Sequence, residues 1–251
     1  MIAHRRLPLD PARRHLVLGD LHGRHATLAA LLERVGHDPA RDVVYAVGDL
    51  IDRGPDAVAV VERFGRERWH AVRGNHEQMI LNPARWREVW ERPRNGGRAT
   101  RAALARHGRD LDWLAAFCRT LPVCLDVGEE GAPGAFRLIH AESPFDWPEE
   151  RLVRTLARTG PGEPGESRLL WGRSDVERVL EAPADADGRR RVEVHPGRST
   201  RRVFCGHTSL PDVVGAAGTH WIDTFAGGFM TCVEALTMTV HREPLAPSDR
   251  R

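Results

Sequence analysis

The 251-residue sequence has no lysine, one tyrosine and no long run of apolar residues. Its 37 basic residues are therefore all arginine, and because 35 acidic residues nearly balance them the net charge is only +2. Bulk binding of nucleic acid needs a clustered basic surface, so this balance argues against a nucleic-acid partner. No stretch approaches the roughly 20 apolar residues that span a bilayer, and the first residues lack the apolar segment of a signal peptide. The sequence therefore predicts a soluble, cytoplasmic protein without a membrane partner.

Cysteine is also scarce. The four cysteines, Cys118, Cys124, Cys205 and Cys232, form no C-x-x-C pair and no dense framework. A chain of this length can bury a substantial core without the help of disulfides. We therefore expect reduced and mostly buried thiols.

The first eighty residues alternate between short apolar runs and stretches with apolar residues at helical spacing. This rhythm predicts strands at residues 15–18, 43–47 and 69–72, and helices at residues 27–35 and after Pro55. Repeated strand–turn–helix units predict right-handed crossovers and a mainly parallel sheet. In such sheets, ligands bind beyond the carboxyl ends of the strands.

Beyond residue 81 the pattern changes. Residues 82–120 are predicted to form a helical insert rich in Trp and Arg, with a break at residues 93–97. Further strands are predicted at residues 123–127, 136–139, 203–205, 213–214, 220–222 and 230–240, and surface loops at residues 160–167 and 182–191. Since the chain shows no internal repeat and no convincing boundary, residues 1–251 are predicted to form a single domain.

Three short motifs follow the first three predicted strands, namely Gly19-Asp20-Leu21-His22-Gly23, Gly48-Asp49-Leu50-Ile51-Asp52-Arg53-Gly54 and Gly74-Asn75-His76-Glu77. A site for two divalent cations needs a shared oxygen ligand. Asp49 is the natural bridge, because a carboxylate has two oxygens and enough charge to hold two cations. Asp20 and His22 can reach one ion together, and Asn75 offers an amide oxygen to the second. The motifs therefore indicate a two-metal hydrolase site.

Two later histidines, His140 and His207, end further predicted strands. A lone histidine at a strand end is usually only a polar terminus. Both residues follow buried-looking strands and the second cation still needs ligands, but on the residues alone a polar strand end and ligation both stay open. A set of nitrogen and oxygen ligands without thiolate suits Mn, Fe or Zn.

These motifs resemble the signature of the phosphoprotein phosphatase branch of the calcineurin-like metallophosphoesterases, over residues 20–225. They look most similar to small bacterial and phage Ser/Thr protein phosphatases, on His140-Ala141, Arg73-Gly74-Asn75-His76-Glu77-Gln78-Met79 and Asn95-Gly96-Gly97. The resemblance implies an α/β fold, a β-sandwich flanked by helices in α/β/β/α layers. It implies that Asp20, His22 and Asp49 hold the first metal, and that Asp49, Asn75, His140 and His207 hold the second. For a bacterial member it favours manganese.

The same resemblance implies the catalytic roles. Arg53 and Arg173, together with Asn75, are expected to bind the phosphate, because a guanidinium can donate two parallel hydrogen bonds. His76, oriented by Asp52, is expected to protonate the leaving group. The expected reaction is direct attack of a metal-bridging hydroxide on phosphorus. None of the four cysteines lies in a phosphate-cradling loop, which argues against a cysteine-dependent phosphatase.

The favoured function is metal-dependent dephosphorylation of phosphoserine and phosphothreonine in proteins, or of a small phosphoester. The enzymatic alternative is a diadenosine tetraphosphate hydrolase. The Asp52-Arg53 pair looks less like the symmetrical type and does not exclude the asymmetrical one. The non-enzyme alternative, an inactive phosphate-binding module, is disfavoured by the intact ligand set. No element for a regulatory subunit is recognisable.

Four other residues are given supporting roles. We expect core packing for Trp86, Trp90 and Trp113. We expect Asp223 to support the active centre without ligation.

Overall fold

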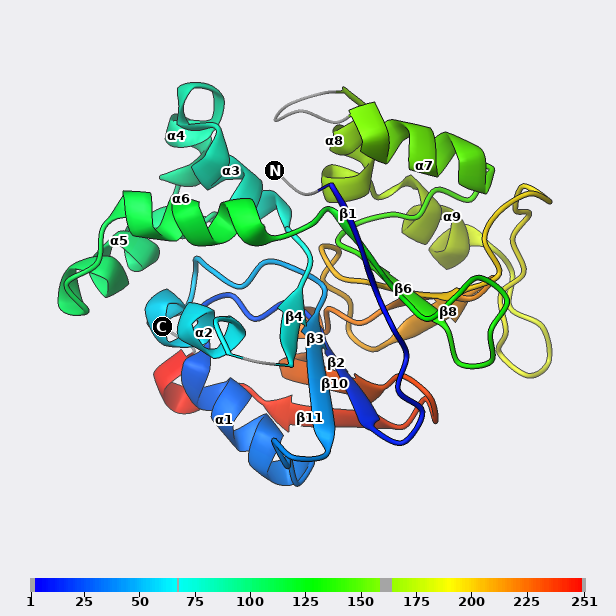
Figure 1. Ribbon diagram of the computed structural model, residues 1–251, viewed down its shortest axis with the longest axis horizontal. Coiled ribbons are helices and arrows are strands. Elements are labelled where there is room, and N and C mark those ends of the chain that lie inside the picture. Colours follow the sequence, from blue (N-terminus) through cyan, green and yellow to red (C-terminus); the bar gives the residue numbers. More distant parts are fainter. Residues whose placement is uncertain (1–2, 67, 159–163, 250–251) are drawn as a thin grey trace.

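The computed structural model describes residues 3–66, 68–158 and 164–249 (Figure 1). Its strands are β1 (His4–Leu7), β2 (Arg14–Leu18), β3 (Asp42–Ala46), β4 (Trp69–Ala71), β5 (Cys124–Val127), β6 (Phe136–Ile139), β7 (Arg202–Cys205), β8 (Val214–Ala216), β9 (Thr219–Trp221), β10 (Phe229–Glu234) and β11 (Val240–Pro244). Its helices are α1 (His25–Arg34), α2 (Ala57–Phe64), α3 (Asn75–Leu81), α4 (Pro83–Trp90), α5 (Gly97–Arg106), α6 (Leu111–Thr120), α7 (Glu149–Arg158), α8 (Pro164–Trp171) and α9 (Ser174–Glu181), with two 3-10 turns, η1 (Phe225–Gly227) and η2 (Pro247–Asp249).

The strands form two mixed sheets, with the orders β1-β5-β6-β7-β9-β8 and β11-β10-β2-β3-β4. The predicted parallel pairing is confirmed for β2, β3 and β4. β10 joins the same sheet antiparallel to β2. The pairs β5–β6, β8–β9 and β10–β11, for which the sequence predicted no direction, are also antiparallel. The connections within these three pairs are too short for a crossover helix. For the same reason residues 230–240 form a hairpin instead of the single strand predicted.

The two sheets pack face to face. Successive side chains of β2 point to opposite faces, as the period of a strand requires. Val17 lies between the sheets in one core cluster with Tyr45 of β3 and Phe136 of β6, whose ring centroids are 5.3 Å apart. Leu16 and Leu18 instead join a cluster with the helices α1 to α6. The other sheet is covered by α7 to α9. These are the α/β/β/α layers, and the predicted fold class is confirmed.

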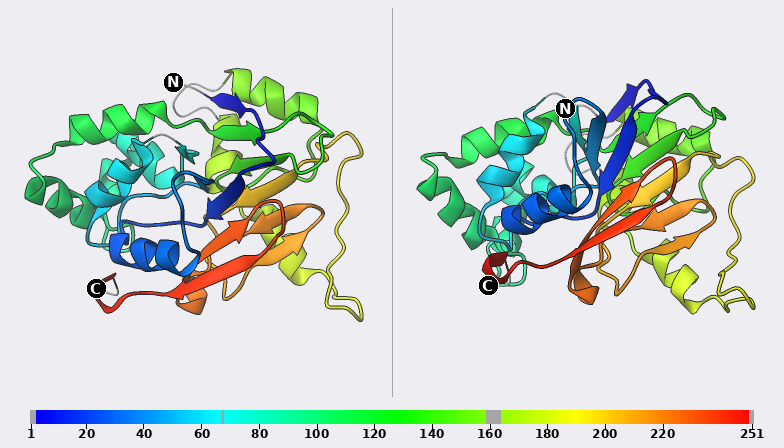
Figure 2. Two further views of the ribbon diagram at one scale, coloured as in Figure 1. Left: turned by 60° about the horizontal axis from the view of Figure 1, so that its bottom comes forward. Right: turned by 90° about the horizontal axis from the view of Figure 1, so that it is seen from below.

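Figure 1 shows α3 to α6 grouped on one side of the strands and α7 to α9 on the other. The helices α4 to α6 occupy the stretch predicted to be helical, and α7 to α9 were not indicated by the sequence. The loop predicted over residues 160–167 is wrong from residue 164 on, because α8 buries Leu169 and Leu170 against β5 and β6; residues 160–163 lie outside the described residues. The loop predicted over residues 182–191 is confirmed, and the segment between α9 and β7 projects from the body of the molecule (Figure 2).

All four cysteines are buried and free, as predicted. In the part of the chain that the structure describes, we find no helix with the length and apolar character needed to cross a bilayer.

A buried ion-pair network joins β5, β6 and α7. The fully buried Arg137 donates to Asp126 at 2.6 and 2.9 Å and to Glu149 at 2.6 and 2.8 Å. Against the effect of burial, Arg137 holds the pKa of Asp126 below its usual range. The stabilisation is therefore present at neutral pH and is lost only as the pH falls far into the acid range.

The substitution Asp126→Asn is expected to lower the free energy of unfolding by about 3 kcal/mol, because it leaves a buried guanidinium short of one counter-charge. Urea unfolding at neutral pH measures this change. Glu150→Gln, on the exposed face of α7, is the control and should leave the midpoint within error of the native protein. Equal midpoints for the two variants would contradict the expectation.

Candidate metal centre

The three motifs meet at one edge of a sheet. β2 pairs in parallel with β3, and β3 with β4. Asp20 and Asp49 follow the ends of β2 and β3, and Asn75 begins α3 after β4. Because the carboxyl ends of parallel strands lie at the same edge, the three side chains converge.

Asp49 lies at the centre of a buried cluster. Its carboxylate oxygens are 3.6 Å from His22 Nε2, 3.8 Å from His76 Nε2 and 3.4 Å from His140 Nε2. Two groups of close ligand atoms share this residue: His22, Asp49 and His76 form one, and Asp49, His140 and His207 form the other. A shared carboxylate between two groups is the arrangement that a pair of cations requires.

The remaining predicted ligands border the same cluster. The side-chain oxygen of Asn75 is 2.9 Å from His140 Nε2 and 3.0 Å from His207 Nδ1. Asp20 accepts from the backbone N–H of His207 at 3.2 Å and lies 3.8 Å from His22 Nε2. The structure thus brings all six predicted ligands together, and their binding of metal stays a prediction.

The histidine rings are oriented by backbone carbonyls. His22 Nδ1 lies 3.0 Å from the carbonyl oxygen of Ile51, and His140 Nδ1 lies 2.8 Å from that of Val47. A carbonyl only accepts, so in the neutral ring Nδ1 carries the hydrogen and Nε2 presents a lone pair to Asp49.

Lone pairs that face carboxylate oxygens in a buried site repel each other unless a cation lies between them. Among the described residues, His22 Nε2 and His207 Nε2 are buried and make no hydrogen bond. The donor set consists of nitrogen and oxygen atoms. The residues present therefore fit divalent cations.

Burial and charge set the protonation states. Burial acts to raise the pKa of Asp49, but the surrounding histidines outweigh it and hold that pKa below its usual range. Burial lowers the pKa values of His22 and His140. Burial, with the charges of His140 and Arg173, lowers the pKa of His207 to about 2. Cation binding needs an ionised carboxylate and imidazole nitrogens without protons, so cations would compete with protons at this site. Asp20 differs, because burial and the nearby Asp223 and Asp49 raise its pKa.

The backbone is strained at several of the predicted site residues. Five predicted site residues have positive φ angles, namely His22 (44°), Asp49 (49°), Asp52 (72°), Arg53 (62°) and His207 (66°). Such angles are uncommon for residues other than glycine and cost of order 1–3 kcal/mol each. Among the other non-glycine residues that the structure describes, only Arg68, Ala217 and Met238 share them. Strain is therefore concentrated at the candidate site.

His76 and Asp52 lie together as predicted, with His76 Nδ1 2.7 Å from Asp52 Oδ2. Burial acts against a charge on His76, but Asp49 and Asp52 outweigh it and raise the pKa of His76. The other ring nitrogen faces Asp49 and lies 3.4 Å from an Arg53 amino nitrogen. Arg53 and Arg173 are both exposed, and Arg173 directly precedes α9.

Glu77 has a role that the sequence analysis missed. Its buried carboxylate accepts from the backbone N–H groups of Asp49, Leu50 and Gly74 at 3.0, 2.8 and 2.8 Å. It thereby joins the second motif to the third and fixes the backbone that carries Asp49. The available signal was its place at the third position of α3, where a Glu caps the helix start.

Asp223 was predicted to support the active centre without ligation. Its side chain is buried and accepts from the backbone N–H of Phe225 at 3.1 Å.

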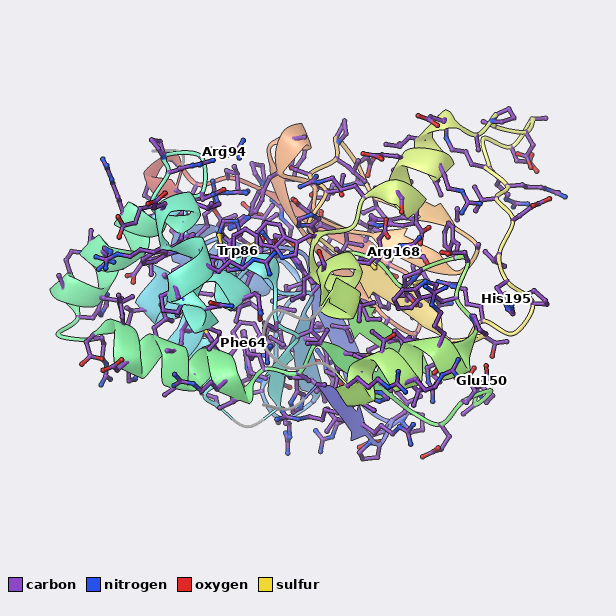
Figure 3. All side chains as sticks on the ribbon, turned by 90° about the horizontal axis from the view of Figure 1, so that it is seen from above. Phe64, Trp86, Arg94, Glu150, Arg168 and His195 are labelled. Atoms are coloured by element: carbon purple, nitrogen blue, oxygen red, sulfur yellow. The ribbon has the colours of Figure 1, made fainter. Side chains whose placement is uncertain are left out.

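The helical insert contacts α8 beside the site. Trp86 of α4 stacks on Trp171 of α8 with ring centroids 5.0 Å apart. The Trp171 ring lies 6.3 Å from that of His207. Figure 3 shows Trp86 on the side of α4 toward α8. The insert therefore borders the site.

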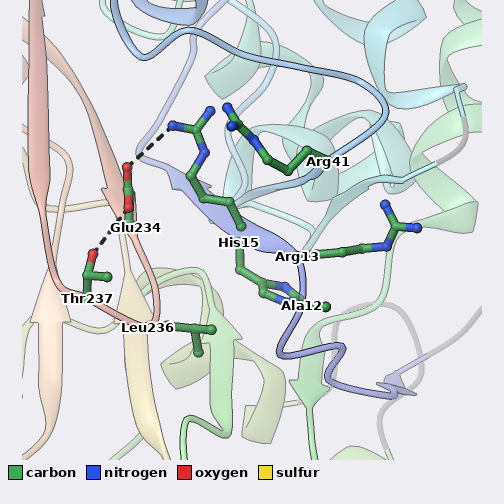
Figure 4. A pocket seen from close by; sticks show the side chains of 8 residues that line it. Ala12, Arg13, His15, Arg41, Glu234, Leu236 and Thr237 are labelled. Carbon is green, nitrogen blue, oxygen red and sulfur yellow. Dashed lines mark hydrogen bonds and ion pairs between the residues drawn. The ribbon is translucent and has the colours of Figure 1, made fainter.

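A separate pocket of about 430 Å³ lies at the opposite end of β2 (Figure 4). It is lined by Ala12, Arg13, Arg14, His15, Arg41, Glu234, Leu236 and Thr237. Arg14 pairs with Asp42 at 2.6 Å and with Glu234 at 3.6 Å. The charge of Arg14 is thus balanced locally, and the convergent ligands lie at the other end of the strand.

Comparisons with known proteins agree with this geometry. Residues 13–211 match the family model of the calcineurin-like phosphoesterases. The chain is 31% identical over 225 residues to Serine/threonine-protein phosphatase 1 of Salmonella typhimurium, covering 87% of this chain and 90% of that protein. It is 38% identical over 155 residues to a symmetrical bis(5'-nucleosyl)-tetraphosphatase of Chromohalobacter salexigens, covering 60% of this chain and 52% of that protein.

Among solved structures, a protein proposed to be a diadenosine tetraphosphatase aligns with a TM-score of 0.62 at 19% identity, covering 98% of this chain and all of that one. A protein serine/threonine phosphatase of Saccharomyces cerevisiae aligns with a TM-score of 0.59 at 13% identity, covering 98% of this chain and 84% of that one. Both support the fold alone. The chain belongs to the calcineurin-like metallophosphoesterase family, within its phosphoprotein phosphatase branch.

Proposed function

We propose that this metallophosphoesterase removes phosphate from phosphoserine and phosphothreonine in proteins, with manganese as its cation. The observation that carries the proposal is the convergence of two ligand groups on the shared Asp49, beside the His76–Asp52 pair. The substrate class is supported by the similarity to Serine/threonine-protein phosphatase 1, which extends over nearly the whole of both chains. The cytoplasmic location is part of the same proposal.

The positions of the side chains support the following roles. One cation would be held by Asp20, His22 and Asp49, and the other by Asp49, Asn75, His140 and His207. When bound, two such cations withdraw charge from phosphoryl oxygens and make water nucleophilic at neutral pH. Arg53 and Arg173 are exposed at the border of the cluster and are suited to bind phosphate oxygens. His76 keeps Nδ1 on Asp52 and offers Nε2 as proton donor to the leaving oxygen.

A second candidate is hydrolysis of dinucleoside tetraphosphates. The relatives include symmetrical bis(5'-nucleosyl)-tetraphosphatases at 38% and 29% identity. These matches span 52% and 66% of the relatives' own lengths, whereas the phosphatase match spans 90%. Coverage therefore favours the protein phosphatase.

A substrate comparison with added MnCl2 tests the proposal. We expect kcat/KM for a phosphoserine peptide to exceed that for diadenosine tetraphosphate by at least about 10-fold, a difference of about 1.4 kcal/mol in transition-state stabilisation. The reverse preference would assign the chain to dinucleoside polyphosphate hydrolysis. If the protein hydrolyses neither of these substrates nor p-nitrophenyl phosphate, the remaining interpretation is an inactive phosphate-binding module.

A further inference from the structure

The Asp52 carboxylate receives two hydrogen bonds from the helical insert. Trp90 Nε1, at the end of α4, lies 2.8 and 3.0 Å from its two oxygens. Thr100 Oγ1, in α5, donates to Asp52 Oδ1 at 2.6 Å and accepts from the Asp52 backbone N–H at 3.0 Å. All three residues are buried. Trp90 was expected only to pack in the core, so its bond to a site carboxylate is a role that the sequence did not reveal.

The chemistry of these donors fixes the state of the histidine. An indole N–H can only donate. The Thr100 hydroxyl accepts from the Asp52 backbone N–H and donates its own hydrogen to Asp52 Oδ1. Both groups thus donate to Asp52. With a carboxylate as the acceptor, the atom of His76 that faces it, Nδ1, carries a hydrogen. The other nitrogen of the ring remains directed at the ligand cluster.

The insert holds both groups rigidly. A methyl group added at Gly97 would come within 2.6 Å of the Trp90 ring carbons, so the indole lies flush against the first residue of α5. Gly96 approaches the backbone of Arg53 so closely that any side chain there would clash with it. On the far side, the guanidinium of Arg101 lies 5.1 Å from the centre of the Trp90 ring. The turn between α4 and α5 therefore packs directly on the Asp52–Arg53 segment, where the backbone is strained.

We propose that Trp90 and Thr100 are positioning residues, by which the helical insert fixes the carboxylate, ring orientation and tautomer of the Asp52–His76 pair. The inference rests on the proposed role of His76 as proton donor to the leaving group. It assigns a catalytic purpose to residues 82–120: without these donors, Asp52 can rotate and the imidazole loses its fixed direction. The effect on rate must then depend on how much the leaving group needs a proton.

Trp90→Phe and Thr100→Val each remove one donor and keep most of the volume. With phenyl phosphate, whose leaving group is basic and needs a proton, we expect kcat to fall about 10-fold. With p-nitrophenyl phosphate, whose leaving group departs as the anion, we expect less than about a 2-fold fall. Thr100→Ser, which keeps the hydroxyl, should retain the native ratio of the two rates. Trp113→Phe, in the same insert, and Thr27→Val are the matched controls. Thr27 is a buried threonine that donates to Asp249 and accepts from a backbone N–H away from the site.

A spectroscopic measurement separates this inference from the proposed function. In the metal-free protein with 15N-labelled histidine, the Nδ1–H proton of His76 bonded to Asp52 should resonate far downfield. We expect this resonance to shift or broaden in Trp90→Phe and Thr100→Val, and to stay in place in both controls. Loss of rate by equal factors on the two esters, or an unchanged resonance, overturns the inference. Wild-type turnover of p-nitrophenyl phosphate tests the proposed function independently.

Discussion

Asp49→Asn is expected to lower kcat/KM for p-nitrophenyl phosphate by at least about 1000-fold in the presence of manganese, which is about 4 kcal/mol of lost transition-state stabilisation. Asp49 is the residue that both ligand groups share, and its oxygens lie 3.4 to 3.8 Å from three histidine nitrogens. An amide offers one neutral oxygen in place of two charged ones. It cannot hold two cations together.

Metal binding gives a readout that does not depend on turnover. Free manganese at 100 times its dissociation constant stabilises the folded chain by about 2.7 kcal/mol, so the melting temperature of the native protein should rise when manganese is added. The melting temperature of Asp49→Asn should rise little, and this variant should retain less than the full complement of metal after dialysis. Asp187→Asn, an exposed carboxylate in the loop before β7, should behave as the native protein. Full metal content and activity in Asp49→Asn would refute the two-cation centre.

The candidate ligands were accessible to prediction because each belongs to a local pattern. Asp20, Asp49 and Asn75 follow apolar runs whose parallel pairing could be predicted from the strand–turn–helix rhythm. Their convergence then follows from sheet geometry. His140 and His207 were identified with the help of a family resemblance, since a single histidine after a strand carries little information. Their place beside Asn75 agrees with that reading.

In the second sheet, β1 was not predicted, because its sequence His-Arg-Arg-Leu lacks the apolar alternation of a half-buried strand. β6 was predicted at its observed bounds, but the complete burial of its Arg137 was not. Burial of Arg137 is tolerated because Asp126 and Glu149 neutralise its charge. No local sequence pattern predicts these two ion pairs. The helix α8 was not predicted because its Gly and Pro content is typical of a loop. Tertiary packing stabilises the helix against this local preference.

Trp90 and Thr100 illustrate the same limit at the site. They reach Asp52 across 38 and 48 positions of the sequence. Their side chains have the composition of an ordinary helix core, and only the three-dimensional packing of α4 and α5 directs them to the carboxylate. Thr100 also accepts from the backbone N–H of Asp52, a residue with a strained, positive φ angle. Residues that supply ligands are thus visible in local motifs, whereas residues that orient them are distributed through the fold.

His76→Gln is expected to lower kcat for phenyl phosphate by about 100-fold or more, the size of effect typical of a lost general acid. The loss with p-nitrophenyl phosphate should be at least about 10-fold smaller, because that leaving group needs no proton. His76 Nε2 lies 3.8 Å from Asp49 and in one group of ligand atoms with His22, so the structure also permits a role in holding metal. The two roles differ in their consequences. A proton donor leaves manganese content and the manganese-induced rise in melting temperature unchanged, whereas a ligand reduces both and slows the two esters equally. The second pattern would remove His76 from the acid role and add it to the metal centre.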